Sequence, residues 1–352
     1  MPDARVQSAI DHWAPRFTGA GVDYNDFVRT TSAVERWEDW LDAWDGLGDR
    51  HAELAREAEA LERRQTAADA WLRAAVAYHF GKFVWVVDPD RYRPVHEKSV
   101  DAYYRAHRLL GSGLERVEVP LEDTVMPGNL RTPDGVEQAP LVVLVPGLDS
   151  TKEEFFYNEE SFLRRGMATF SLDGPGQGES QYELALRHDY EVAVTAGLDT
   201  LEGRSDLDFD RIGIVGVSMG GYLAPRAAAF EPRIRAVVAA SGAYKRVQIY
   251  DDLPPLNRET FIRKTKTANA DEAREVAVQM DLEGVLDHME QPALFVTGDR
   301  DRLVPWQQTE AQAKAAPNGH FVLIEGGTHV VSNFPYLFRP LISDWMREQL
   351  VA

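Results

Sequence analysis

The hydrophobic pattern of the first 113 residues is helical. Apolar side chains recur at spacings of three and four, which places them on one face of each predicted helix. One stripe comprises Trp37, Trp40, Leu41 and Trp44, and another comprises Leu72, Ala75, Val76, His79, Phe80 and Phe83. We expect Pro89 and Pro94 to bracket a break between helices and residues 111–113 to form a linker. The pattern therefore predicts a helical N-terminal domain over residues 1–115.

These aromatic stripes have more than one interpretation. They pack inside the helical domain, or they form an apolar face that docks as a cap on the rest of the chain or joins a homodimer. Six tryptophans precede the linker: Trp13, Trp37, Trp40, Trp44, Trp71 and Trp85. His79 lies on such a stripe, so we interpret it as a core residue, with a substrate-facing role as the alternative.

After the linker the pattern changes to short apolar strands that alternate with helical segments. Residues 117–121 alternate and are followed by a Pro-Gly-Asn turn signal, which predicts an antiparallel hairpin. Residues 141–145 are continuously apolar, as is typical of a strand covered on both faces. Further strands are predicted at 168–172, 212–215, 236–239, 293–297 and 321–324, with helices at 153–165, 182–201, 222–230 and 336–350. This alternation predicts an α/β domain with a mostly parallel, doubly wound sheet over residues 116–352.

One interval interrupts the alternation. About fifty residues separate the strand that ends near Ser241 from the strand that begins at Ala293, which is longer than one crossover helix requires. We expect residues 243–290 to form a helical insertion that covers the carboxyl edge of the sheet as a lid.

Composition and charge limit the partners. The chain has 352 residues and a net charge of -19, which disfavours nucleic acid and anionic membranes as binding partners. It contains no cysteine, so disulfides, thiolate metal ligands and a cysteine nucleophile are excluded. The first residues lack a signal-peptide pattern and no apolar run reaches membrane-spanning length. We expect a soluble cytoplasmic protein that acts on a small molecule and needs neither a cofactor nor a metal.

The clearest chemical motif is Gly216-x-Ser218-x-Gly220, which lies between the predicted strand at 212–215 and the predicted helix at 222–230. A serine on a sharp strand-to-helix turn is the structural context of a nucleophile elbow. The glycines are needed because side chains there would collide with neighbouring backbone. Gly-x-Ser-x-Gly strings also occur in ordinary turns, so the interpretation depends on suitable partners elsewhere in the chain.

A serine nucleophile requires a base and a third group that orients the base. Both must lie in loops at the carboxyl ends of strands, and His329 follows the strand at 321–324 in this way. Asp299 and Asp301 both follow the strand at 293–297 and are alternative candidates for the acid. For an oxyanion hole we expect the backbone amides of Met219 and Leu148. The glycine-rich residues 173–180 lack the lysine of a phosphate-binding loop and are interpreted as a structural loop beside the pocket.

Together these motifs resemble the α/β-hydrolase superfamily over residues 116–352. They are the serine elbow, Gly298-x-x-Asp301-x-x-Val304-Pro305 and Gly326-Gly327-Thr328-His329. In that superfamily the order is Ser, Asp, His, and the acid is usually the aspartate three residues after the glycine. The resemblance therefore implies a triad of Ser218, Asp301 and His329.

A narrower resemblance involves the helical N-terminal domain, residues 146–154 and Pro254-Pro255-Leu256. These features are similar to the branch that contains 2,6-dihydroxypseudooxynicotine hydrolase and fungal polyketide-shortening hydrolases. The resemblance implies hydrolytic C–C cleavage of an aromatic or polyketide-derived ketone. Carboxylesterases also belong to the wider group, so ester hydrolysis is the alternative reaction. A non-catalytic fold that binds a small molecule is the alternative of another class.

The lid is where this chain departs from that branch, in which an additional lid carboxylate is expected. Asp251 or Asp252 would fill this role by protonating a leaving group, which requires a pKa raised by burial. Exposed, solvated lid charges are the alternative interpretation. Tyr250 is expected to line the substrate pocket.

Overall fold

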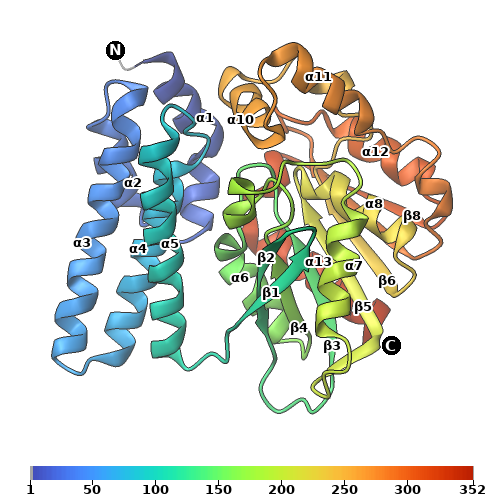
Figure 1. Cartoon of the computed structure of the whole chain (residues 1–352), viewed down its shortest axis with the longest axis horizontal. Coiled ribbons are helices and arrows are strands. Elements are labelled where there is room, and N and C mark those ends of the chain that lie inside the picture. Colours follow the sequence, from blue (N-terminus) through green and yellow to red (C-terminus); the bar gives the residue numbers. More distant parts are fainter. Residues whose placement is uncertain (1–2, 352) are drawn as a thin grey trace. The chain divides into compact units, whose positions relative to one another are not determined.

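The protein divides into two compact units in the computed structural model, which describes residues 3–351. The first unit extends to Leu114 and the second begins at Glu115. Figure 1 labels the elements of both units.

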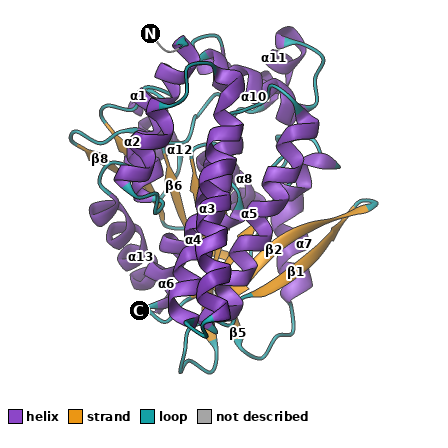
Figure 2. Cartoon of the chain, turned by 90° about the vertical axis from the view of Figure 1, so that its left-hand side faces the viewer, coloured by secondary structure: helices purple, strands orange, loops and turns teal. Residues whose placement is uncertain are grey.

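The N-terminal unit is entirely helical within its described residues. Its elements are α1 (Ala4–Gly19), α2 (Tyr24–Ser32), η1 (Trp37–Asp39), α3 (Trp40–Ala60), α4 (Arg64–Lys82) and α5 (Pro89–Leu110). Figure 2 shows α3, α4 and α5 running side by side. Aromatic rings fill their interior: Phe17 stacks on Phe80 with ring centroids 3.8 Å apart, and Trp44 packs edge-on against Phe17.

The predicted break between helices lies at a different place. It spans residues 83–88, and α5 begins at Pro89 and contains Pro94, so Pro94 does not border the break. Asp88 caps α5 by accepting hydrogen bonds from the amides of Asp90 and Arg91, and proline is well suited to the first helical position. Pro94 lies early in the helix, where its missing N–H removes a single intrahelical bond.

The second unit contains an eight-stranded sheet with the order β1-β2-β4-β3-β5-β6-β7-β8. The strands are β1 (Glu115–Leu121), β2 (Thr124–Arg131), β3 (Ala139–Val145), β4 (Ala168–Leu172), β5 (Leu207–Val217), β6 (Ile234–Ala240), β7 (Ala293–Gly298) and β8 (Gly319–Ile324). The predicted antiparallel hairpin is confirmed as β1 and β2, although residues 127–130 lie in β2 rather than in the turn. From β4 to β8 all pairs are parallel, which confirms the predicted α/β class.

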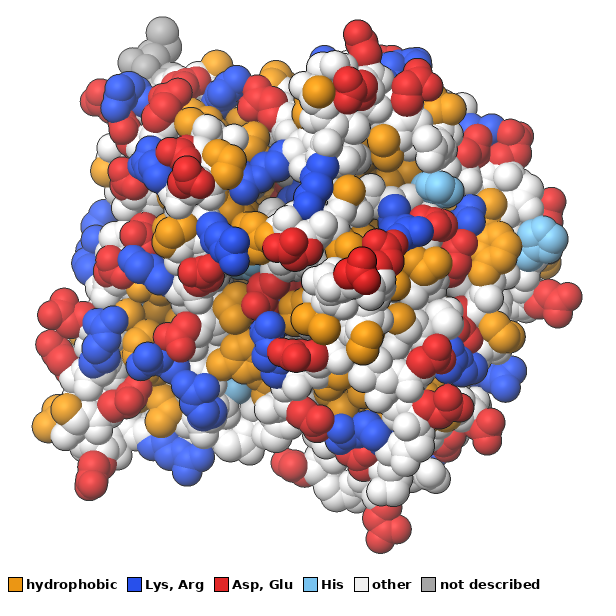
Figure 3. All heavy atoms as spheres, in the orientation of Figure 1, with side chains coloured by type: hydrophobic (Ala, Val, Ile, Leu, Met, Phe, Trp, Pro, Cys, Tyr) orange, Lys and Arg blue, Asp and Glu red, His pale blue; other side chains and the backbone are white. Residues whose placement is uncertain are grey.

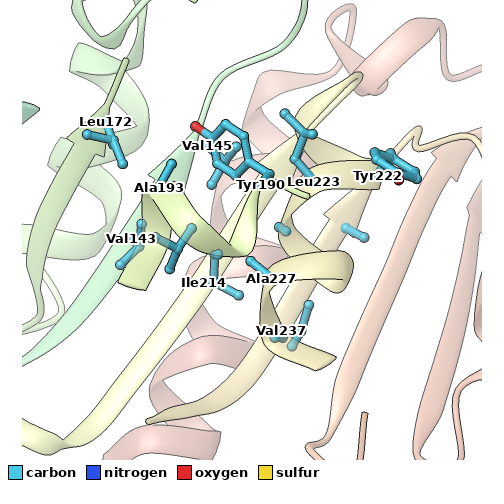
Figure 4. Close-up of a cluster of buried hydrophobic side chains, with 14 of the residues drawn as sticks. Val143, Val145, Leu172, Tyr190, Ala193, Ile214, Tyr222, Leu223, Ala227 and Val237 are labelled. Atoms are coloured by element: carbon cyan, nitrogen blue, oxygen red, sulfur yellow. The ribbon is translucent and has the colours of Figure 1, made fainter. Parts of the chain in front are cut away.

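Helices cover both faces of the sheet because the side chains of its central strands are apolar in both directions. On one face, Val143, Ile214 and Val237 pack against α7 (Glu191–Leu201) and α8 (Gly220–Phe230), as Figure 4 shows. On the other face, Val142 and Val215 pack with α6 (Phe156–Leu163) and α13 (Pro335–Val351). α12 (Trp306–Ala315) contacts β7 and β8.

One predicted helix is shorter than expected. The segment 182–201 is helical only from Glu191, and a short turn of helix, η3 (Gly178–Tyr182), precedes it. Residues 183–190 instead form a loop after η3, in which Leu184 and Leu186 are buried. The amide of Leu186 donates to the carbonyl oxygen of Lys264, so this loop bonds to the insertion rather than to a helical turn of its own.

The insertion between β6 and β7 is helical. It contains α9 (Val247–Tyr250), α10 (Pro255–Thr265), α11 (Ala270–Gln279) and η4 (Leu286–His288). An isolated bridge between Lys245 and Asp281 joins its two arms near the sheet. Lys264 at the end of α10 donates to Gln181 Oε1 at 2.8 Å. Because Gln181 belongs to η3, the insertion rests on a loop at the carboxyl end of β4.

Acidic and basic side chains are interspersed on the face drawn in Figure 3. Among the described helices, none is both long and apolar enough to cross a lipid bilayer.

Candidate active site

Ser218 lies on the tight turn between β5 and α8. Its φ of +59° is in the left-handed region, which is strained for a residue with a side chain. A Cβ at Gly216 would overlap the carbonyl oxygen of Gly220, and a Cβ at Gly220 would overlap that of Val145. The Ser218 amide donates to the carbonyl oxygen of Ala240 at 2.8 Å. Glycines and the neighbouring strand end therefore hold this serine in position.

Three side chains from three loops form a continuous hydrogen-bond relay. His329 Nε2 lies 2.7 Å from Ser218 Oγ, and His329 Nδ1 lies 2.7 Å from Asp301 Oδ2. The second oxygen of Asp301 accepts the amides of Leu303 and Val304 at 2.9 and 3.0 Å. Since a carboxylate only accepts, Nδ1 carries the proton and Nε2 can accept the serine hydroxyl proton. Asp301 has no exposed side-chain surface, so its contact with His329 is shielded from competing water.

The two candidate aspartates have different contacts. Asp301 reaches His329, whereas Asp299 Oδ1 accepts the amide of Gly326 at 2.7 Å. Asp299 thus braces the loop that leads to the histidine, and the geometry favours Asp301 as the group that orients the ring.

The loop that carries His329 is held by contacts that the sequence analysis missed. Val330 and Val331 have φ values of +57° and +52°, which are costly for β-branched residues. The Val330 amide donates to Ser241 Oγ at 2.9 Å, and Ser241 Oγ lies 3.1 Å from Thr297 Oγ1. A small polar residue at the end of a buried strand was the only sequence signal for Ser241.

The loop that follows β3 lies against Ser218. We call residues 146–151 the β3 exit loop. A Cβ on Gly147 would lie 3.2 Å from Ser218 Cβ, so the glycine permits this approach. Within residues 3–351, neither the Leu148 amide nor the Met219 amide donates a hydrogen bond to another part of the chain. Both amides are therefore available to an oxygen atom of a ligand.

Gln177 holds the β3 exit loop in place through side-chain hydrogen bonds. Its side-chain amide donates to the carbonyl oxygen of Pro146 at 2.6 Å and to that of Gly147 at 3.3 Å. Its Oε1 accepts the Tyr190 hydroxyl at 2.7 Å, and burial raises the pKa of Tyr190, so that hydroxyl stays a donor. The segment 173–180, interpreted from sequence as a structural loop, thus also contains a brace for the β3 exit loop.

A cluster of buried charges lies at the other end of the same loop. Lys152 is fully buried and pairs with Glu153 at 2.6 Å, with Asp173 at 3.0 Å and with Glu179. Carboxylate oxygens of the three acids lie within 4.8 Å of one another, a spacing that a metal ion would accept. The Lys152 ammonium already contacts all three acids, however, which favours a structural ion-pair cluster over a metal site.

Comparisons with known proteins identify the family of this chain. A family model described as "Esterase FrsA-like" matches residues 23–252. The chain belongs to the FrsA-like esterase family. It is 32% identical over 284 residues to the 2,6-dihydropseudooxynicotine hydrolase of Paenarthrobacter nicotinovorans, covering 80% of this chain and 76% of that enzyme.

Other relatives extend the same relationship. A 20-hydroxy-prefusarin hydrolase of Gibberella moniliformis is 36% identical over 185 residues, which cover 49% of this chain and 44% of the fungal enzyme. The crystal structure of a 2,6-dihydroxy-pseudo-oxynicotine hydrolase superposes with a TM-score of 0.86 at 31% identity, covering 96% of this chain and 95% of that chain. The protein is thus an α/β-hydrolase, as its sequence resemblance implied.

The predicted lid residues of this FrsA-like protein do not form a buried acidic site. Asp251 and Asp252 are both exposed, and Asp251 pairs with Arg274 at 3.2 Å on the surface of the insertion. The burial that a proton-donor role requires is absent, so the exposed-charge interpretation fits both residues. Tyr250 is buried, but its hydroxyl donates to the carbonyl oxygen of Ala270 at 2.9 Å and its ring packs on Phe261. Tyr250 therefore contributes to the core of the insertion.

His79 belongs to the N-terminal unit. It is buried on α4 and its ring packs against Phe80 and Phe83. These contacts match the interpretation of His79 as a core residue, and a substrate-facing role for His79 stays a prediction.

Proposed function

We propose that Ser218, His329 and Asp301 form the catalytic triad of a serine hydrolase. The observation that carries this proposal is the pair of 2.7 Å contacts that place the imidazole between the hydroxyl and the carboxylate. His329 removes the Ser218 proton as the hydroxyl attacks a carbonyl carbon, and Asp301 keeps the ring in the required tautomer.

The tetrahedral intermediate that follows bears a negatively charged oxygen. The amides of Met219 and Leu148 donate to this oxygen in our proposal, supported by the approach of the β3 exit loop to Ser218. The intermediate then collapses to an acyl-enzyme, and the leaving group takes the proton held by His329. Water, activated by the same imidazole, releases the acyl group as a carboxylic acid.

For the leaving group we propose carbon. The substrate is an aromatic or polyketide-derived ketone in which a carbonyl-stabilised carbon departs from the acyl group. The C–C bond breaks, its electron pair stays on the departing carbon as an enolate, and the proton from His329 neutralises that carbon. Water supplies the remaining hydroxyl and proton, so the products are an acid and a ketone. The similarity to a bacterial pseudooxynicotine hydrolase and to fungal hydrolases supports this choice.

The second candidate is a carboxylesterase, which the description of the matched family as esterases favours. The two reactions share the acyl-enzyme and differ only in the leaving atom. Comparing aryl 1,3-diketones with 4-nitrophenyl esters separates them, with Ser218→Ala as the inactive control. C–C hydrolysis predicts diketone turnover that depends on Ser218, and turnover of esters alone would overturn it.

A binding protein without catalysis is the alternative of another class. A fluorophosphonate probe distinguishes it, because the probe labels only an activated serine. We expect the wild type to be labelled and Ser218→Ala to be unlabelled. A folded wild type that resists the probe would favour the binding protein.

We further propose that residues 1–115 act as a helical cap, that the enzyme is cytoplasmic and that its partner is a small-molecule substrate. The aromatic stripes of this domain are an alternative surface for a homodimer. Measuring the molecular mass of the undeleted chain in solution tests the dimer directly.

A further inference from the structure

Arg246 is a buried cation at the start of the lid. It directly precedes α9, and only 6% of its surface is exposed. Burial lowers the pKa of its guanidinium to about 10, so the group is still charged at neutral pH. Its backbone is anchored, because its amide donates to the carbonyl oxygen of Met280 at 2.9 Å.

Among residues 3–351 the Arg246 guanidinium makes no hydrogen bond and no ion pair, and its Nε is fully covered. Asp149 attracts it electrostatically but lies beyond the 4.0 Å of an ion pair. Two other buried cations differ in this respect: Arg131 pairs with two glutamates and Lys152 with three carboxylates.

An unpaired buried charge is strongly unfavourable, because its lost hydration is not replaced. The nearest compensation is the ring of Phe261, whose centroid lies 5.1 Å from the Arg246 guanidinium carbon. A cation–π contact supplies only part of the stabilisation that an ionic partner would give the buried charge. An anionic group of a ligand would supply the missing ionic partner.

The surroundings place Arg246 within electrostatic reach of the β3 exit loop, which contacts Ser218. Asp149 directly follows Leu148 in the β3 exit loop, and Gly147 of that loop lies against Ser218. On the other side, Phe261 belongs to α10 of the lid. The guanidinium therefore lies between the lid and the loop that contacts the serine.

We propose that Arg246 binds a carboxylate of the substrate. This inference rests on the proposed hydrolase function and specifies its substrate class: a molecule that carries an anionic carboxylate some atoms away from the carbonyl that Ser218 attacks. A guanidinium offers paired N–H donors that match the two oxygens of a carboxylate. A local cation is also required because the net charge of -19 repels anionic substrates from the chain as a whole.

The test compares two esters of similar length, mono-4-nitrophenyl glutarate, which carries a carboxylate, and 4-nitrophenyl pentanoate, which is neutral. For Arg246→Gln we expect kcat/KM on the glutarate ester to fall about 10- to 100-fold, mainly through KM, because a charge-assisted hydrogen bond is lost. The pentanoate value should stay within about threefold, because that ester makes no ionic contact. Arg246→Lys should retain part of the preference for the acid, which a purely structural role would not explain.

Arg274→Gln is the matched control, since Arg274 is a lid arginine that pairs with Asp251 on the surface. It should leave both esters unaffected. Equal losses on the two esters in Arg246→Gln, or a wild type that does not prefer the acid, would overturn the proposal. If circular dichroism shows that Arg246→Gln does not fold, the same comparison is made with Arg246→Lys. The preference of Arg246→Lys for the glutarate ester must then be weaker than that of the wild type.

A binding measurement separates this proposal from the hydrolase proposal. Calorimetric titration with glutarate should detect binding to the wild type and to Ser218→Ala, and weaker binding to Arg246→Gln. Glutarate binding that depends on Arg246, in a protein that hydrolyses no substrate and resists fluorophosphonate, would refute the hydrolase and retain the anion site. Hydrolysis that does not depend on Arg246 would instead refute the anion site and retain the hydrolase.

Discussion

Replacing Asp301 with asparagine should abolish most of the activity without disturbing the loop. In the native protein Oδ1 accepts the amides of Leu303 and Val304, while Oδ2 accepts from His329. An asparagine oxygen must stay on the two amides, because the opposite orientation would point its NH2 group at two N–H donors. The new NH2 group therefore faces His329 Nδ1.

This orientation fixes the wrong tautomer of the imidazole. Nδ1 becomes an acceptor, the ring proton moves to Nε2, and Nε2 can no longer take the proton of Ser218. We expect kcat to fall about 10⁴-fold, the size of effect that the wrong tautomer produces in serine proteases. This corresponds to roughly 5 kcal/mol of lost transition-state stabilisation.

The assay is the hydrolysis of a 4-nitrophenyl ester, with thermal unfolding measured on the same samples. Asp299→Asn is the matched control on the same loop, because its oxygen can still accept the amide of Gly326. That variant should stay within about threefold of the wild type, as expected where one neutral hydrogen bond is retained. If Asp301→Asn retains more than about a tenth of the wild-type kcat, the proposed role of the tautomer is incorrect.

Three further predictions follow from the contacts. Gln177→Leu removes the brace of the β3 exit loop, so kcat should fall about tenfold or more with KM nearly unchanged; equal changes in both constants would contradict this. Burial raises the pKa of Glu179, but Lys152 and a neighbouring arginine outweigh it and lower that pKa to about 2. The wild type should therefore lose roughly 3 kcal/mol of unfolding free energy, measured with urea, as the pH falls from about 5 towards 2, and Glu179→Gln should show a flatter profile. Asp251→Asn and Asp252→Asn should leave ester and diketone turnover within about twofold of the wild type, because exposed charges contribute little. A large loss of turnover would instead support a catalytic role for one of these carboxylates.

The local part of the site could be predicted from sequence. A strand, a glycine-framed serine and a helix determine the turn at Ser218, and the loops after β7 and β8 begin where the apolar runs end. Because parallel strands present their carboxyl ends at one edge, these loops meet there. The contact of His329 with Ser218 and Asp301 is consistent with that expectation.

The supporting contacts could not be predicted in this way. Gln177 and Ser241 act through partners that are distant in sequence, and the burial of Arg246 depends on distant residues such as Phe261. No local pattern distinguishes these three residues from other polar residues in loops. Burial of the lid residues likewise depends on tertiary packing: adjacent Tyr250 and Asp251 have opposite environments, one inside the insertion and one outside. Pro94 shows the same limit, since a proline early in a helix resembles a helix boundary in the sequence.

The bridge between Lys245 and Asp281 brings the two arms of the insertion together at its base. Everything between them is one uninterrupted stretch of chain, whereas Ser218, Asp301 and His329 all lie outside it. We therefore expect that grafting the corresponding segment of another family member between these two positions would leave the reacting groups in place and replace the surroundings of Arg246.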